Sequence, residues 1–267
     1  MLPLLRMGLR LGGAPRLLLT TTPKPIGALR RLLAEAGCAV TRAPTSENAG
    51  ALAPAFLEGL EALYGGTRLA RQELEGVLVE GEGALWRAEE LARCRGAAPA
   101  RLDRVVVAVD PPATAGGDAC GIVAAGRAGD RVYVLEDATA GGLSPLGWAR
   151  RAADCARRWG AAAIVAESNQ GGEMVASTLR SAGAETPVKP VWAGRSKRAR
   201  AEPVAALYEQ GRVVHCGGFP QLEEELMALG SVDGPGRESP DRADALVWAL
   251  TELMLGPAAV EPRIRLL

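Results

Sequence analysis

The chain has few of the residues that commonly serve as soft metal ligands or as nucleophiles. It contains one histidine, His215, and five scattered cysteines, none of them in a C-x-x-C pair. An odd number of cysteines without that spacing argues against both a zinc site and a disulfide framework. We therefore expect reduced thiols in a cytoplasmic protein. His215 lies beside Cys216 in a short apolar run, so we expect a structural role for it.

The sequence also lacks a charge imbalance and a long apolar segment. Lys plus Arg and Asp plus Glu each number 31, so there is no overall positive field to hold nucleic acid, and any such contact must be local. No apolar run reaches about 18 residues, so we expect no membrane span and no export signal. A hydrophobic content of 48% is ample for a packed core.

The chain is expected to form two domains, at 1–95 and 96–267, separated by the stretch G-A-A-P-A-R-L-D. For the first domain the pattern predicts one strand and two helices, at 15–22, 26–36 and 54–64. An isolated strand leaves backbone groups unpaired on both edges. We therefore expect this part to be the tail of a larger α/β domain.

The second domain has a hairpin-like beginning followed by alternating helices and strands. Strands are predicted at 105–110, 121–126, 131–137, 162–167, 188–192 and 213–215. Helices are predicted at 145–159, with Ser144 as N-cap, and at 172–182, 200–210 and 241–255. Turns are expected at Gly116-Gly117-Asp118 and Gly129-Asp130. Three antiparallel strands followed by this alternation indicate an α/β fold of the ribonuclease-H-like type, a mixed sheet flanked by helices.

Four acidic residues stand at the ends of these predicted elements. Asp110 and Glu167 each close an apolar strand, and Asp241 and Asp244 share one face of the first turn of the last helix. Turn formation competes as an explanation for Asp110, a simple exit from the sheet for Glu167, and favourable helix-terminal charge for the two aspartates. If the two strands are neighbours and the helix packs across them, all four carboxylates converge.

Converging carboxylates repel one another unless cations bind between them. Two Mg²⁺ or Mn²⁺ ions fit, because hard cations prefer oxygen ligands and an ion pair can hold both the attacking and the leaving oxygen of a phosphodiester. This chemistry requires no His, Cys or Ser nucleophile. The acids therefore favour a metal-dependent nuclease.

A basic cluster, R-S-K-R-A-R, lies in a predicted loop before the 200–210 helix. Its candidate phosphate-binding residues are Arg195, Lys197, Arg198 and Arg200. Few aromatic residues are interleaved with these charges, so we expect duplex backbone rather than stacked single-stranded bases as the target. A solvated surface loop is the alternative interpretation.

Four stretches of the second domain resemble the large subunit of phage terminases, including those of prophage and gene-transfer-agent type. They are V-A-V-D-P-P at 107–112, V-A-E-S-N-Q-G-G-E-M-V at 165–175, R-A-E-P-V-A-A-L-Y-E-Q-G-R-V-V-H at 200–215 and S-P-D-R-A-D-A-L-V-W-A-L at 239–250. The resemblance implies an endonuclease that cuts concatemeric double-stranded DNA during packaging. It places the catalytic acids at Asp110, Glu167 and the final helix, with Asp241 as the primary ligand and Asp244 as the second.

The first domain also resembles this family. The segment at 15–25 resembles the part of the family's motor that couples ATP hydrolysis to DNA movement, and the segments at 52–57, 64–74 and 83–86 are similar to the family as well. The phosphate-binding loop G-x-x-x-x-G-K-[ST] and a strand ending in Asp-Glu are absent from the sequence, so no independent ATP hydrolysis is expected. We expect an N-terminally truncated terminase, with a separate ATPase chain as a candidate partner. The resemblance implies the portal protein and the small terminase subunit as further partners.

Two other interpretations remain open from the sequence. A catalytically inactive terminase remnant could retain the fold and dock on portal or motor partners. A junction resolvase or transposase of the same fold would use the same acids, and a preference for branched DNA would distinguish it.

Overall fold

The computed structural model describes residues 10, 13–23, 27–78, 85–112, 119–169, 171–229 and 240–256. Contacts divide the chain into two compact units, Met1–Gly83 and Ala84–Leu267. Among the described residues, none of the helices combines the length and apolar character needed to cross a membrane.

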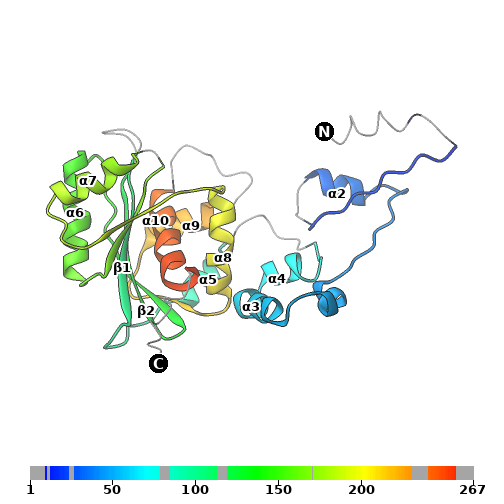
Figure 1. Cartoon of the computed structure of the whole chain (residues 1–267), viewed down its shortest axis with the longest axis horizontal. Coiled ribbons are helices and arrows are strands. Elements are labelled where there is room, and N and C mark those ends of the chain that lie inside the picture. Colours follow the sequence, from blue (N-terminus) through cyan, green and yellow to red (C-terminus); the bar gives the residue numbers. More distant parts are fainter. Residues whose placement is uncertain are drawn as a thin grey trace, which may run out of the picture. The chain divides into compact units, whose positions relative to one another are not determined.

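The first unit is helical over the residues that the structure describes. Its elements are α2 (Gly27–Leu33), the 3-10 helix η1 (Thr45–Ala51), α3 (Pro54–Tyr64) and α4 (Arg68–Glu73) (Figure 1). The predicted helix at 54–64 is confirmed. The predicted strand at 15–22 is wrong: this segment is irregular, and Leu18 is 87% exposed. A strand requires a neighbour to pair with, and no strand lies among the described residues of this unit.

The second unit contains a six-stranded mixed sheet. Its strands are β1 (Arg104–Asp110), β2 (Gly121–Ala128), β3 (Arg131–Asp137), β4 (Ala163–Glu167), β5 (Val188–Val191) and β6 (Val213–His215), in the order β5-β4-β1-β2-β3-β6. The β1–β2 and β2–β3 pairs are antiparallel, whereas β4 runs parallel to both β1 and β5. The predicted mixed α/β fold is confirmed, including the return of 162–167 beside the first strand.

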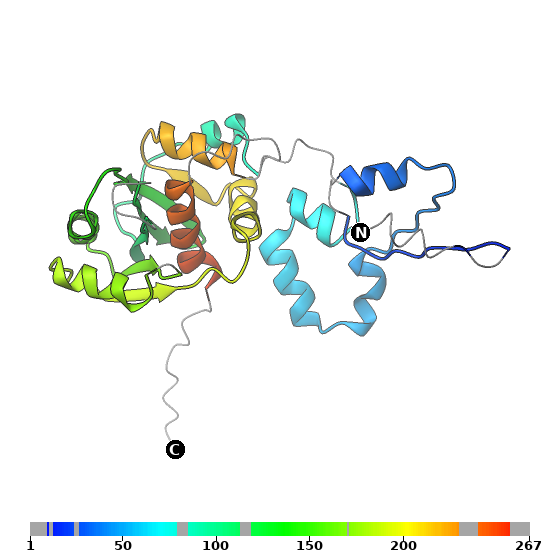
Figure 2. The same cartoon turned by 90° about the horizontal axis from the view of Figure 1, so that it is seen from above.

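Helices cover both faces of this sheet (Figures 1 and 2). Six helices and a π-helical turn are described here: α5 (Ala88–Arg93), α6 (Pro145–Arg158), α7 (Glu173–Ser181), α8 (Lys197–Glu209), α9 (Pro220–Ala228), α10 (Asp241–Leu250) and η2 (Thr251–Leu255). Helices α6 and α7 pack on one face, and α5, α8, α9 and α10 pack on the other. The sequence predictions missed α5 and α9.

Strand β1 is buried on both sides because the helices cover both faces. Val107 and Val109 pack with the α6 side, whereas Val106 and Ala108 pack with the α10 side. Successive side chains of a strand point to opposite faces, so every second residue belongs to the same core. The same alternation sets the face of the sheet on which each acid at a strand end lies.

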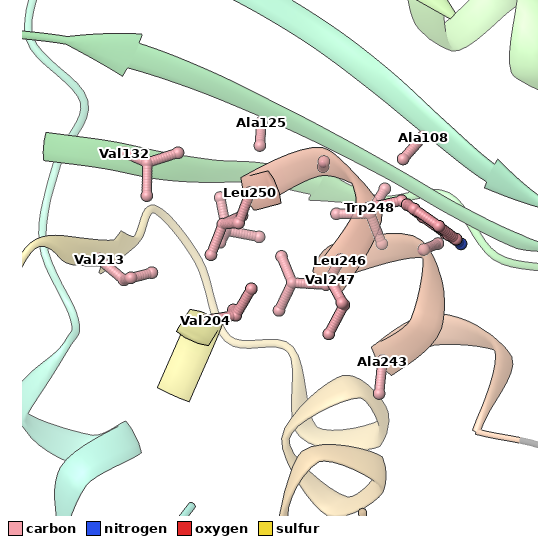
Figure 3. Packing of buried hydrophobic residues seen from close by; sticks show 14 of the residues in the cluster. Ala108, Ala125, Val132, Val204, Val213, Ala243, Leu246, Val247, Trp248 and Leu250 are labelled. Carbon is pink, nitrogen blue, oxygen red and sulfur yellow. The ribbon is translucent and has the colours of Figure 1, made fainter. Parts of the chain in front are cut away.

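Helix α10 is the centre of the larger core. Leu246, Val247 and Leu250 lie between the strands and Val204 of α8 (Figure 3). Every residue from Ala243 to Leu250 is buried. The predicted terminal helix across the sheet is confirmed, with η2 forming its last turn. Burial of this apolar surface fixes the start of α10 against the strands, where the acidic residues are located.

Local turn chemistry agrees with the sequence where it is described. Gly129 has a φ of 60° in the turn between β2 and β3, a conformation that favours glycine. Ser144 caps α6, its hydroxyl accepting a 3.2 Å hydrogen bond from the amide of Gly147. The predicted turn at Gly116-Gly117-Asp118 lies outside the described residues.

Candidate active site

Asp110 and Glu167 end two neighbouring parallel strands. Val109 is paired with Ala166, so the next residue on each strand emerges at the same edge of the sheet. Alternation places Asp110 on the face of Ala108 and Glu167 on the face of Val165, and both of these neighbours belong to the core around α10. The two predicted acids therefore face the same helix.

A glycine brings the start of α10 into contact with this edge. Gly121 is the register partner of Asp110. A Cβ atom at Gly121 would lie 1.9 Å from the carbonyl oxygen of Asp241, a distance that no side chain allows. The absence of a side chain lets α10 begin directly against β2, next to the end of β1.

Asp241 and Asp244 are buried at the beginning of α10. Asp241 is 6% exposed and Asp244 is 1% exposed. The N-cap is Pro240, and the amide of Asp244 donates a 2.8 Å hydrogen bond to its carbonyl. The Asp244 carboxylate also forms ion pairs with Lys197 and Arg200 of α8.

The four carboxylates interact electrostatically. Burial raises the pKa of Asp110 well above its ordinary value, and the negative charges of Asp244, Glu167 and Asp241 raise it further. Lys197 opposes this shift. The neighbouring thiol of Cys120 has its pKa raised by burial and by Asp110 and Asp241. The structure thus brings all four predicted acids close enough for their charges to be coupled.

Two basic residues of α8 reach the same acids. The Nζ atom of Lys197 lies 2.5 Å from Oδ2 of Asp244. The guanidinium of Arg200 lies 3.2 Å from Oδ1 of Asp244 and 3.5 Å from Oε2 of Glu167. Arg200 is thereby a bridge between the strand acid and the helix acid.

Trp248 is part of this arrangement, although the sequence predictions gave it no role. Its indole N–H donates a 2.6 Å hydrogen bond to Glu167, and its ring lies 4.7 Å from the guanidinium carbon of Arg200. This cation–π contact and hydrogen bond fix both charged partners. Trp248 follows Asp244 by four residues on α10, so its helical spacing was the signal that could have identified it.

The basic cluster lies on a helix rather than in the predicted loop. Ser196 caps α8, accepting a 3.3 Å hydrogen bond from the amide of Ala199, so the helix begins at Lys197. Arg198 pairs with Glu202 at 3.3 Å, and Arg195 is exposed just before the helix. Two of the four residues predicted to bind phosphate, Lys197 and Arg200, therefore contact the acids.

His215 belongs to a separate buried cluster. Its Nε2 lies 2.8 Å from the hydroxyl of Tyr208, and its Nδ1 lies 3.2 Å from Glu223. Glu223 also forms an ion pair with Arg95 at 2.6 Å. Burial lowers the pKa of His215. These contacts agree with the structural role predicted for this residue.

The chemistry of the donor set fits a hard divalent cation, because all four groups are carboxylates with an excess of negative charge. Within the described ranges, however, no three His, Cys, Asp or Glu side chains are arranged closely enough to hold a metal ion as they stand. The Asp244 carboxylate contacts Lys197 and Arg200.

Comparisons with known proteins agree with this architecture. The family model described as the terminase RNaseH-like domain matches residues 107–253, which include the four acids. The chain belongs to the terminase family. A second model, the N-terminal part of the T4likevirus-type terminase large subunit, matches residues 4–93. No curated protein matches the chain.

Solved structures of terminases are similar to this chain. The large terminase of a thermophilic bacteriophage is 13% identical with a TM-score of 0.56, covering 80% of this chain and 54% of that protein. The same protein in complex with ADP is 12% identical with a TM-score of 0.57, covering 80% and 55%. The large terminase nuclease of thermophilic phage G20c is 16% identical with a TM-score of 0.49, covering 64% and 99%. The chain thus spans about half the length of the first of these proteins.

Proposed function

We propose that this chain is an endonuclease that hydrolyses phosphodiester bonds of double-stranded DNA during phage genome packaging, with two Mg²⁺ or Mn²⁺ ions. Its membership of the terminase family supports the packaging context. The observation that carries the proposal is the convergence of the acids at one edge of the sheet: Arg200 contacts both Glu167 and Asp244, and Gly121, the register partner of Asp110, lies against Asp241.

Asp110, Glu167, Asp241 and Asp244 would hold the ions. A bound divalent cation supplies Lewis acidity at the scissile phosphate and neutralises its charge. Trp248 and Arg200 keep Glu167 oriented through the hydrogen bond and the ion pair described above. Burial of the two aspartates at the start of α10 keeps water from screening their charges.

The remaining basic residues supply the contact with duplex DNA in this proposal. Arg195 is exposed just before α8, and Arg198 lies in the first turn of that helix, where it pairs with Glu202. Their charges would bind backbone phosphate, and Lys197 and Arg200 would complete the contact. Portal protein, a small terminase subunit and a separate ATPase chain are the proposed partners in the host cytoplasm. The chain itself is not expected to hydrolyse ATP, because its sequence has no G-x-x-x-x-G-K-[ST] loop.

A plasmid assay tests the proposal. With Mn²⁺, the full chain should nick or linearise supercoiled plasmid, and a chelator should stop the reaction. Asp110→Asn and Glu167→Gln should abolish cleavage while their circular dichroism remains that of the folded protein. Asp154→Asn is the matched control, because Asp154 is an exposed α6 carboxylate paired with Arg157 at 2.9 Å. Cleavage at wild-type rate in both acid variants contradicts the proposal.

A docking remnant without nuclease activity is the second candidate. The observation in its favour is that basic groups occupy Asp244, so the acids do not form a ready-made metal site among the described residues. Duplex binding without cleavage under any divalent cation would favour this candidate.

A further inference from the structure

Lys197 and Arg200 contact the same carboxylate from different environments. The Arg200 side chain is 10% exposed and lies against the Trp248 ring. The Lys197 side chain is 45% exposed and reaches Asp244 from the first residue of α8. Arg200 is therefore fixed by packing, whereas the lysine head group can leave toward solvent without disturbing the core.

The ammonium of Lys197 interacts with three of the four carboxylates, those of Asp244, Asp110 and Asp241. Burial lowers its pKa, but the contact with Asp244 and the negative charges of Asp244, Asp110 and Asp241 raise it overall. Its position against Oδ2 of Asp244, which is 1% exposed, is one that an oxygen-binding cation would also occupy. Two cations on one carboxylate oxygen repel each other strongly at low dielectric.

We propose that Lys197 is an exchangeable stand-in for a divalent cation: its ammonium holds Asp244 in the metal-free protein, and it is displaced when the metal binds. The displaced ammonium is then available to a phosphate of the DNA. This inference rests on the proposed function, because it assumes that the four acids bind metal. It also explains how one lysine can belong both to the acidic cluster and to the predicted DNA-binding residues.

The exchange has a consequence for affinity. A charge that must be displaced weakens metal binding, and coupling of this kind between two ligands typically changes affinity by about 5- to 150-fold. Removing the lysine charge should therefore strengthen binding of Mn²⁺. Because linkage is reciprocal, metal should also free the lysine for DNA.

Calorimetric titration of Mn²⁺ into the full chain tests the first part. Lys197→Gln should bind Mn²⁺ about tenfold more tightly than wild type, within the range expected for such coupling. Lys197→Arg keeps the charge and should stay within a few-fold of wild type. Lys189→Gln is the matched control with unchanged affinity, because Lys189 is 50% exposed and pairs with Glu252 at 2.7 Å, outside the acidic cluster.

The salt dependence of binding to a short duplex tests the second part. Each phosphate contact contributes about 0.9 to the slope of log affinity against log salt. In a chelator, wild type and Lys197→Gln should have equal slopes, because the lysine is held by Asp244. With Mn²⁺, binding is measured by stopped-flow anisotropy before cleavage. The slope for wild type should then be steeper than that for Lys197→Gln by about 0.9, the value of one phosphate contact.

The outcomes separate the two proposals. Equal Mn²⁺ affinity in wild type and Lys197→Gln overturns the exchange and leaves the metal site intact. Weaker binding in Lys197→Gln also overturns it, because the lysine would then assist the metal. Failure of both proteins to bind Mn²⁺ overturns the exchange together with the proposed function.

Discussion

Two of the buried polar clusters among the described residues of the second unit differ in their charge balance. In the cluster around His215, one carboxylate, Glu223, faces the imidazole and the guanidinium of Arg95. At the end of β1, four carboxylates face Lys197 and Arg200. The first cluster satisfies its polar groups internally and stabilises the fold. The second retains excess negative charge, which a ligand of opposite charge can neutralise.

The largest effect should come from removing the buried cation of the acidic cluster. Arg200→Gln leaves Asp244 and Glu167 without their shared guanidinium, and breaking such a buried pair costs about 3–5 kcal/mol. Chemical denaturation should measure this loss. No measurable loss in the free energy of unfolding would show that the acids are already neutralised by protonation. The two clusters would then not differ in charge balance.

Removing the carboxylate of the balanced cluster should be destabilising. Glu223→Gln weakens the ion pair with Arg95 and the contact with His215, which should lower the free energy of unfolding by about 1–3 kcal/mol. Urea denaturation of the full chain measures the change. An increase in stability would contradict this prediction, because it would mean that neutralising a carboxylate stabilises this cluster as it is expected to stabilise the acidic one.

The equivalent change in the acidic cluster should have the opposite sign. The raised pKa of Asp110 means that the folded protein favours its neutral form. Asp110→Asn resembles that form and should raise the free energy of unfolding in metal-free buffer at neutral pH by about 1–2 kcal/mol. Urea denaturation of Asp110→Asn and Glu223→Gln in parallel measures the two changes. A loss of stability in both variants would contradict the predicted difference in sign.

The smallest effect is the pH dependence of the balanced cluster. Burial lowers the pKa of His215 in the folded protein below the ordinary value of 6.5. The contribution of His215 to the free energy of unfolding is therefore complete above the ordinary pKa. It is lost as the pH falls through the lowered pKa of the folded protein. The unfolding free energy of wild type should decline between about pH 7 and pH 5. His215→Gln should decline less steeply, and identical slopes would exclude this residue as the cause.

Periodicity predicted the sheet because its strands are continuous apolar runs ended by charged or turn residues. It failed at 15–22, where three leucines and three threonines form a strand-like pattern, yet the described unit offers no partner strand. It also missed α9, whose apolar positions Leu222 and Leu226 are separated by three acidic residues, too short a run for a clear pattern. Pairing partners are a tertiary property that local patterns do not contain.

The acidic residues of the candidate site could be predicted, but their partners could not. Each acid ends or begins an element, and those positions are visible in the sequence. The contacts of Arg200 and Trp248 depend on how α8 and α10 pack together. The earlier start of α8 was signalled by Ser196 as N-cap, which makes Lys197 the first residue of the helix, and from this position it reaches Asp244.

The most direct test of the account is the thermal unfolding of wild type and Asp110→Asn with increasing Mn²⁺. A ligand that binds only the folded state stabilises it by mass action, by about 2.7 kcal/mol at a hundredfold excess over the dissociation constant. We predict that Mn²⁺ raises the unfolding midpoint of wild type and leaves that of Asp110→Asn nearly unchanged. Equal shifts in both proteins, or no shift in either, would contradict the claim that these acids form a metal-binding site.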